Sequence, residues 1–119
     1  MKFNEKNLYG IYDLVSTESW ENEVRTDEKS NAGMFIFRPD HMVSVVSGSN
    51  NWVMAYTGKY SLNEDIILIE IKSCVVREME GTTITRKILA LDENNLVVDA
   101  SAPDRIKRTK ITWKKNTQL

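Results

Sequence analysis

Hydrophobic and polar residues alternate along most of this chain, in eight short runs rich in β-branched and aromatic side chains. The clearest run covers residues 52–62, where the large side chains occupy every second position. Because successive side chains of a strand point to opposite faces, this spacing predicts a strand with one buried and one exposed face. The positions expected to face inward are Trp52, Met54, Tyr56, Gly58, Tyr60 and Leu62.

Turn-forming residues separate the runs, among them those at positions 48–51, 63–65, 92–95 and 102–104. Many short strands joined by tight turns are typical of an up-and-down barrel, and a barrel of about eight strands has room for one small ligand. We therefore predict an all-β fold, an eight-stranded antiparallel up-and-down β-barrel forming a single domain over residues 1–119. The expected strands are residues 8–16, 33–37, 42–47, 52–62, 66–71, 82–91, 96–101 and 106–115.

The segment 17–32 is long, rich in charged residues and free of glycine, which predicts a loop. A connection longer than a hairpin needs often has a function, so we hypothesise that it covers the barrel mouth and moves to admit a ligand. Trp20 lies within it. Its indole is expected either to close over apolar surface or to pack against a neighbouring strand.

The composition narrows the range of partners. The 119 residues include 17 acidic residues and 16 lysines or arginines, a formal net charge of −1, which gives no reason to expect nucleic acid or an acidic membrane. No long apolar stretch predicts a membrane span or a signal peptide, so the cytoplasm is the expected location. With one histidine, His41, one cysteine, Cys74, and no phosphate-binding or dinucleotide motif, we expect no metal and no cofactor.

Arg86 is the strongest candidate for chemistry inside the barrel. It shares the parity of Ile84 and Ile88, whereas Lys87 falls on the opposite, outward parity. A guanidinium among aliphatic side chains needs a hydrogen-bond acceptor, because it cannot escape the cost of burial by losing its proton. The acceptor is either a backbone carbonyl at a closed end, with Arg86 stacked on Tyr12 or Trp113, or a carboxylate, enolate or carbonyl of a ligand.

Tyr56 and Tyr60 lie four positions apart in the sequence, on the same predicted interior face, so both hydroxyl groups could reach one ligand, or each other and water. The candidate catalytic residues are therefore Arg86, Tyr56 and Tyr60. The candidate ligand-binding residues are Tyr12, Trp20, Met54, Tyr56, Tyr60, Ile84, Arg86, Ile88 and Trp113.

A series of short motifs runs through nearly the whole chain in a fixed order. They are Leu8-x-Gly10-x-Tyr12-x-Leu14, Gly33 before an aromatic strand, Pro39-Asp40 before a strand with Ser44, Tyr56-x-Gly58-x-Tyr60, Gly81 before Arg86, and Ile111-x-Trp113. This order resembles the bacterial and fungal lipocalin-like domain. The resemblance implies an eight-stranded barrel with a ligand cavity open at one end. It also implies either binding of small hydrophobic molecules or cyclase or isomerase activity in natural-product pathways.

Three positions depart from the pattern of that family. Tyr12 stands where tryptophan is usual, His41 where glycine is usual, and Ile69 where a histidine is often found. The last difference weakens any acid–base role that the resemblance would transfer. Two interpretations of the cavity stay open: a cofactor-independent cyclase or isomerase acting on a small hydrophobic molecule, and a non-catalytic carrier. A third is a protein-interaction module on the outer sheet face, and a homodimer is also open.

Overall fold

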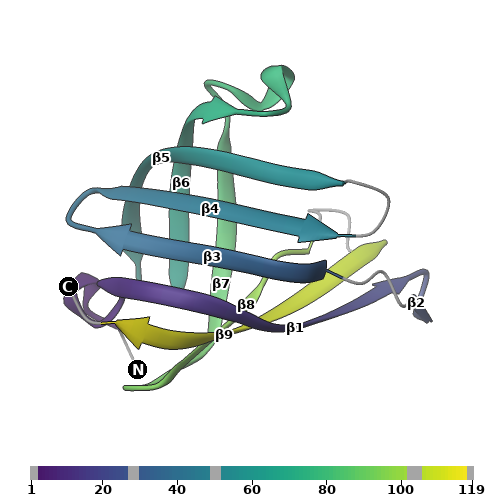
Figure 1. Ribbon diagram of the computed structural model, residues 1–119, viewed down its shortest axis with the longest axis horizontal. Coiled ribbons are helices and arrows are strands. Elements are labelled where there is room, and N and C mark those ends of the chain that lie inside the picture. The colour runs from purple at the N-terminus through teal and green to yellow at the C-terminus, as the bar shows by residue number, and fades with distance from the viewer. Residues whose placement is uncertain (1–2, 27–29, 49–51, 102–105, 118–119) are drawn as a thin grey trace.

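A computed structural model describes residues 3–26, 30–48, 52–101 and 106–117. Eight antiparallel strands form a closed barrel, because each pairs with the next along the chain and the last pairs with the first (Figure 1). This confirms the predicted fold, although the turns expected at 49–51 and 102–104 lie outside the described residues. The strands are β1 (Gly10–Glu21), β3 (Ser30–Arg38), β4 (His41–Gly48), β5 (Val53–Asn63), β6 (Ile66–Cys74), β7 (Thr83–Leu91), β8 (Asn95–Asp99) and β9 (Lys107–Thr117).

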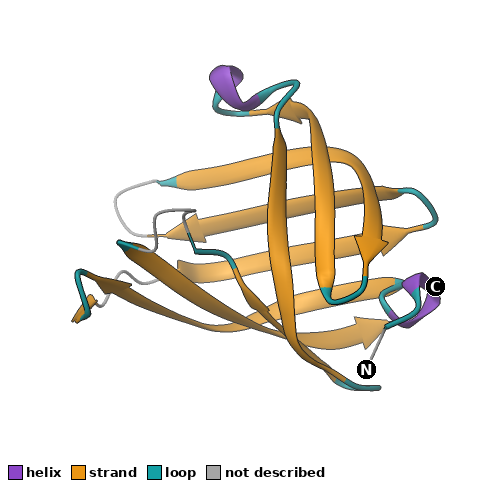
Figure 2. Cartoon of the chain, turned by 180° about the vertical axis from the view of Figure 1, so that it is seen from behind, coloured by secondary structure: helices purple, strands orange, loops and turns teal. Residues whose placement is uncertain are grey.

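The expected loop at residues 17–32 is wrong for most of its length. β1 continues to Glu21 and pairs with β9 along the way, and a short strand β2 (Val24–Thr26) folds back against its end (Figure 2). Asn22 and Glu23 make the turn with positive φ angles of 51° and 67°. Residues 27–29 lie outside the described part of the chain. The polar residues after Ser16 gave no strand pattern, because this part of β1 is stabilised by pairing with β9, which is distant in sequence.

One end of the barrel is filled by side chains, which we call the plug. Leu8, just after the short 3-10 helix η1 (Glu5–Asn7), is fully buried there, as are Tyr12 and Phe37. The Phe37 ring packs edge-on against Tyr12 and Tyr60, with centroids 6.0 and 5.0 Å apart. Because side chains fill this end, space for a ligand inside the barrel lies toward the opposite end.

The inward and outward faces of the strands follow the predicted parity. Lys59 and Lys87 are exposed and Ile88 is buried. The pairing of β7 with β8 shifts register after Ile88, so Ala90, expected to share its face, is exposed instead. Within the described residues, no helix is long and apolar enough to cross a membrane.

Candidate functional site

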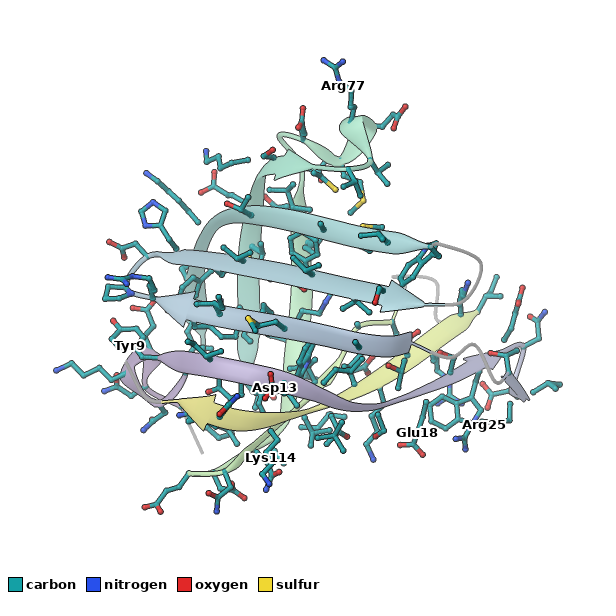
Figure 3. The ribbon with its side chains drawn as sticks, in the orientation of Figure 1. Tyr9, Asp13, Glu18, Arg25, Arg77 and Lys114 are labelled. Carbon is teal, nitrogen blue, oxygen red and sulfur yellow. The ribbon has the colours of Figure 1, made fainter. Side chains whose placement is uncertain are left out.

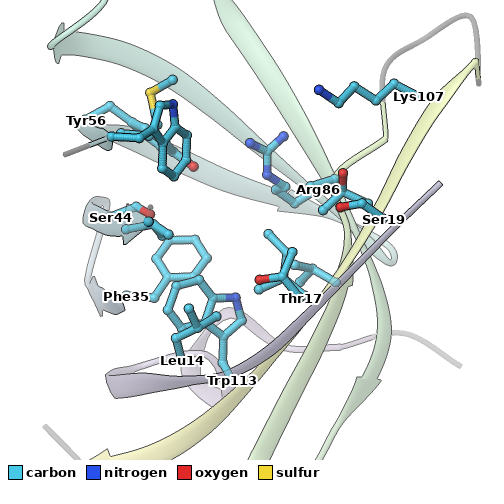
Figure 4. A pocket seen from close by; sticks show the side chains of 17 residues that line it. Leu14, Thr17, Ser19, Phe35, Ser44, Tyr56, Arg86, Lys107 and Trp113 are labelled. Carbon is cyan, nitrogen blue, oxygen red and sulfur yellow. The ribbon is translucent and has the colours of Figure 1, made fainter. Parts of the chain in front are cut away.

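A cavity of about 550 Å³ lies at the end of the barrel opposite the plug (Figure 4). Its floor is apolar and partly aromatic. Trp113 of β9 is 1% exposed and packs on Phe35 of β3 with ring centroids 5.1 Å apart, and Leu14 of β1 completes this surface. Strand alternation brings these side chains together, since each lies on the inward face of its strand.

Polar groups occupy the walls above this floor. Arg86 of β7 extends into the space between Tyr56 of β5 and Ser19 of β1 (Figure 4). One of its nitrogens, Nη1, donates a hydrogen bond of 2.9 Å to the backbone oxygen of Thr85. Among the described residues no other hydrogen bond or ion pair of Arg86 is found, and none holds the Tyr56 hydroxyl. These two groups can therefore offer hydrogen bonds to a bound molecule.

The alternative that places Arg86 at the closed end, stacked on an aromatic ring, does not match its position. In the plug, Lys115 lies over the Tyr12 ring with its Nζ 5.3 Å from the centroid. Arg86 lines the cavity instead.

The structure separates the two tyrosines that the sequence brought together. Tyr56 lines the cavity, but the Tyr60 hydroxyl donates a 2.7 Å hydrogen bond to the Arg38 backbone oxygen in the plug. Tyr12 lies there too, donating to the Leu8 oxygen at 2.9 Å. Burial raises the pKa of both Tyr12 and Tyr60 well above the usual value of 10.0, so both hydroxyls stay neutral structural donors.

Four of the nine candidate ligand-binding residues line the cavity, namely Met54, Tyr56, Arg86 and Trp113. Ile84 and Ile88 pack with the core instead. Trp20 lies outside the cavity lining on the far half of β1, between the guanidinium groups of Arg25 and Arg108, which stand 5.3 and 5.1 Å from its ring. Of the two alternatives for Trp20, the structure therefore shows packing against neighbouring strands and not closure over apolar surface.

Sequence reasoning missed several lining residues. Thr17 and Ser19 were assigned to a loop. A register shift between Leu14 and Ser16 also moves the inward positions of β1 from even to odd numbers, so the parity of Tyr12 and Leu14 would not have found them. Lys107 and Thr109 share the parity of Ile111 and Trp113 on β9, and that alternation was the signal that could have found them. In the described residues no group of three histidine, cysteine or acidic side chains forms a candidate metal site.

Neither a family model nor a curated protein sequence matches this chain. Solved structures do match it over almost their whole length. A lipocalin-like protein from Bacteroides uniformis aligns with a TM-score of 0.60 and 17% identity, covering 92% of this chain and 99% of that one. The fold is lipocalin-like.

Two further structures support this assignment of the lipocalin-like fold. A redesigned β-barrel aligns with a TM-score of 0.59 and 13% identity over 98% of this chain and 97% of that one. An uncharacterized protein from Bacteroides eggerthii aligns with a TM-score of 0.57 and 15% identity over 92% and 99%. At these identities the likeness establishes the architecture, and the function has to be argued from the cavity itself.

Proposed function

We propose that this lipocalin-like barrel binds one small, largely apolar molecule in its cavity. The observation that carries the proposal is an open space of about 550 Å³ above an aromatic floor, in a barrel whose other end is filled. Small-molecule sites typically measure about 300 to 1,000 Å³ and combine an apolar lining with a few polar groups. Phe35 and Trp113 supply the apolar surface, and Arg86 and Tyr56 supply groups that orient the ligand.

Binding is favoured over catalysis by the chemistry of the lining. Its described residues include Arg86 and Tyr56, but no carboxylate, histidine or thiol that could serve as a general base. The Tyr60 hydroxyl, expected to act with Tyr56, is held in the plug. The cavity is therefore better suited to holding a molecule than to moving its protons.

The second candidate function is cyclisation or isomerisation of the bound molecule, as in a natural-product pathway. Arg86 and Tyr56 line one cavity, which favours this candidate because both could polarise a carbonyl while the walls hold a flexible chain in a reactive conformation. Incubation with a panel of linear polyenes and polyketides should then yield a product. Its formation should slow in Arg86→Met and Tyr56→Phe, and absence of any product leaves the carrier function.

Fluorescence titration with N-phenyl-1-naphthylamine, an apolar probe, tests the binding function. We expect saturable binding at one site per chain. Ala100→Trp, which places a large ring among the lining residues, should weaken binding at least tenfold, whereas Ala90→Trp on the exposed side of β7 should leave it within twofold. Thermal melts should show both variants folded. Equal binding by parent and Ala100→Trp would place the probe outside the cavity.

The rival interaction module would use the outer face of β3, β4 and β5. Met34 and Val45 are cross-strand partners, both 42% exposed, and Val43 and Val53 are exposed beside them. A second copy of the chain is the partner to test first. Light scattering at two protein concentrations should show a mass that rises toward a dimer in the parent and stays monomeric in Val45→Lys.

A further inference from the structure

The charges in the cavity lining are of one sign. Arg86 of β7 and Lys107 of β9 line it, and no aspartate or glutamate is found among the lining residues that the structure describes. Both cations lie on one side of the cavity, whereas Leu14, Phe35 and Trp113 lie together away from them (Figure 4). The guanidinium of Arg86 thus lies on one side of the cavity, and the apolar surface lies on the other.

Arg86 is short of acceptors in this position. A guanidinium carries five N–H donors, remains charged at physiological pH, and here has one described hydrogen bond, to the Thr85 oxygen. The Arg86 side chain is partly buried, so water screens its charge less than it would on the open surface. A carboxylate matches the guanidinium in shape and can accept two parallel hydrogen bonds from it.

Two hydroxyl groups of the same cavity suit this ligand. Ser19 of β1, which is 3% exposed, and Thr109 of β9 both line it. Hydroxyl groups can donate to the carboxylate lone pairs that a guanidinium leaves free. By contrast, the aromatic pair Phe35 and Trp113 offers flat apolar surface to a hydrocarbon chain or ring.

We propose that the ligand is an amphipathic monoanion, an apolar molecule with one terminal carboxylate. The carboxylate binds Arg86, and the apolar body lies on the floor made by Phe35 and Trp113. This rests on the proposed binding function and adds the class and the orientation of the ligand. It also distinguishes this cavity from one that selects by apolar surface alone, because a neutral molecule of the same length would leave Arg86 without its acceptors.

Displacement of bound N-phenyl-1-naphthylamine by two matched competitors tests the proposal. Decanoate and 1-decanol have chains of equal length and differ in the charge of the head group. The parent should bind decanoate at least tenfold more tightly than 1-decanol. Raising the salt concentration should reduce this preference, since part of it comes from attraction between charges.

Two matched variants test whether the charge of Arg86 causes the preference for decanoate over 1-decanol. Arg86→Met should weaken decanoate binding at least tenfold and leave 1-decanol within twofold. Arg77→Met makes the same change in the 3-10 helix η2 (Arg77–Met79), where the side chain points away from the barrel, and should behave like the parent (Figure 3). If Arg86→Met does not fold, the comparison of the two competitors in the parent still decides.

The possible outcomes distinguish the proposal of an anionic ligand from the proposal that the cavity binds an apolar molecule. Probe binding with equal affinity for decanoate and 1-decanol in the parent overturns the anionic ligand but leaves the apolar carrier in place. A folded Arg86→Met that keeps the full preference for decanoate overturns the role of Arg86. Failure of the parent to bind the probe, decanoate or 1-decanol contradicts both proposals.

Discussion

Tyr56 and Tyr60 are four positions apart on one strand, and the same Tyr→Phe change should affect them in different ways. The Tyr60 hydroxyl is buried and donates at 2.7 Å to the Arg38 carbonyl. Removing it deletes a buried hydrogen bond and leaves the carbonyl without that donor, a loss of about 1 to 2 kcal/mol in the free energy of unfolding. For a domain of this length, each kcal/mol shifts the Tm by about 4 °C, so Tyr60→Phe should melt about 4 to 8 °C below the parent.

Tyr56→Phe should leave the free energy of unfolding within about 0.5 kcal/mol of the parent, because its hydroxyl has no hydrogen-bond partner among the described residues. Thermal and urea unfolding measure both changes. Titration with N-phenyl-1-naphthylamine adds the functional measurement, and Tyr60→Phe should bind the probe within twofold of the parent because Tyr60 lies outside the cavity lining. A destabilisation of Tyr56→Phe equal to that of Tyr60→Phe, or loss of probe binding in a folded Tyr60→Phe, would refute this division between plug and cavity.

Two other predictions concern stability. A Cβ added to Gly58 would lie 2.0 Å from the Glu70 backbone oxygen, whereas one added to Gly81, at φ +84°, would meet nothing within 4 Å. Gly58→Ala should therefore lower the free energy of unfolding by more than about 3 kcal/mol. Gly81→Ala should lower it by only about 1 to 2 kcal/mol, the strain of a left-handed backbone conformation. Urea unfolding measures both changes, and equal losses would argue against the close approach of β5 and β6. The raised pKa values of Tyr12 and Tyr60 keep both hydroxyls protonated in the folded state, whereas the same hydroxyls ionise near pH 10 in the unfolded chain. The free energy of unfolding should therefore be unaffected by them below pH 10 and fall above it. Urea unfolding between pH 8 and 11 should show a shallower fall in Tyr12→Phe than in the parent, and an identical slope would contradict the assignment.

The sequence alone predicted the architecture because a barrel strand has a local signature. Alternation with period two and turn residues at short intervals depend on neighbours a few positions apart, so all eight barrel strands were found. The same parity correctly placed Lys59 and Lys87 outside and Ile88 inside. The signature failed where side chains are polar on both faces, as in the second half of β1, which is held in the sheet by pairing with β9.

The tertiary structure decided which inward-facing residues meet a ligand and which fill the plug. Parity tells which face of a strand is inside, but not how far along the barrel axis a residue lies. That depth depends on strand tilt and on the register of partners distant in the chain. Thus Tyr56 and Tyr60 share a face and occupy different ends, with Tyr60 fixed to Arg38. Arg86 lines the cavity, a position along the barrel axis that the parity of β7 does not give.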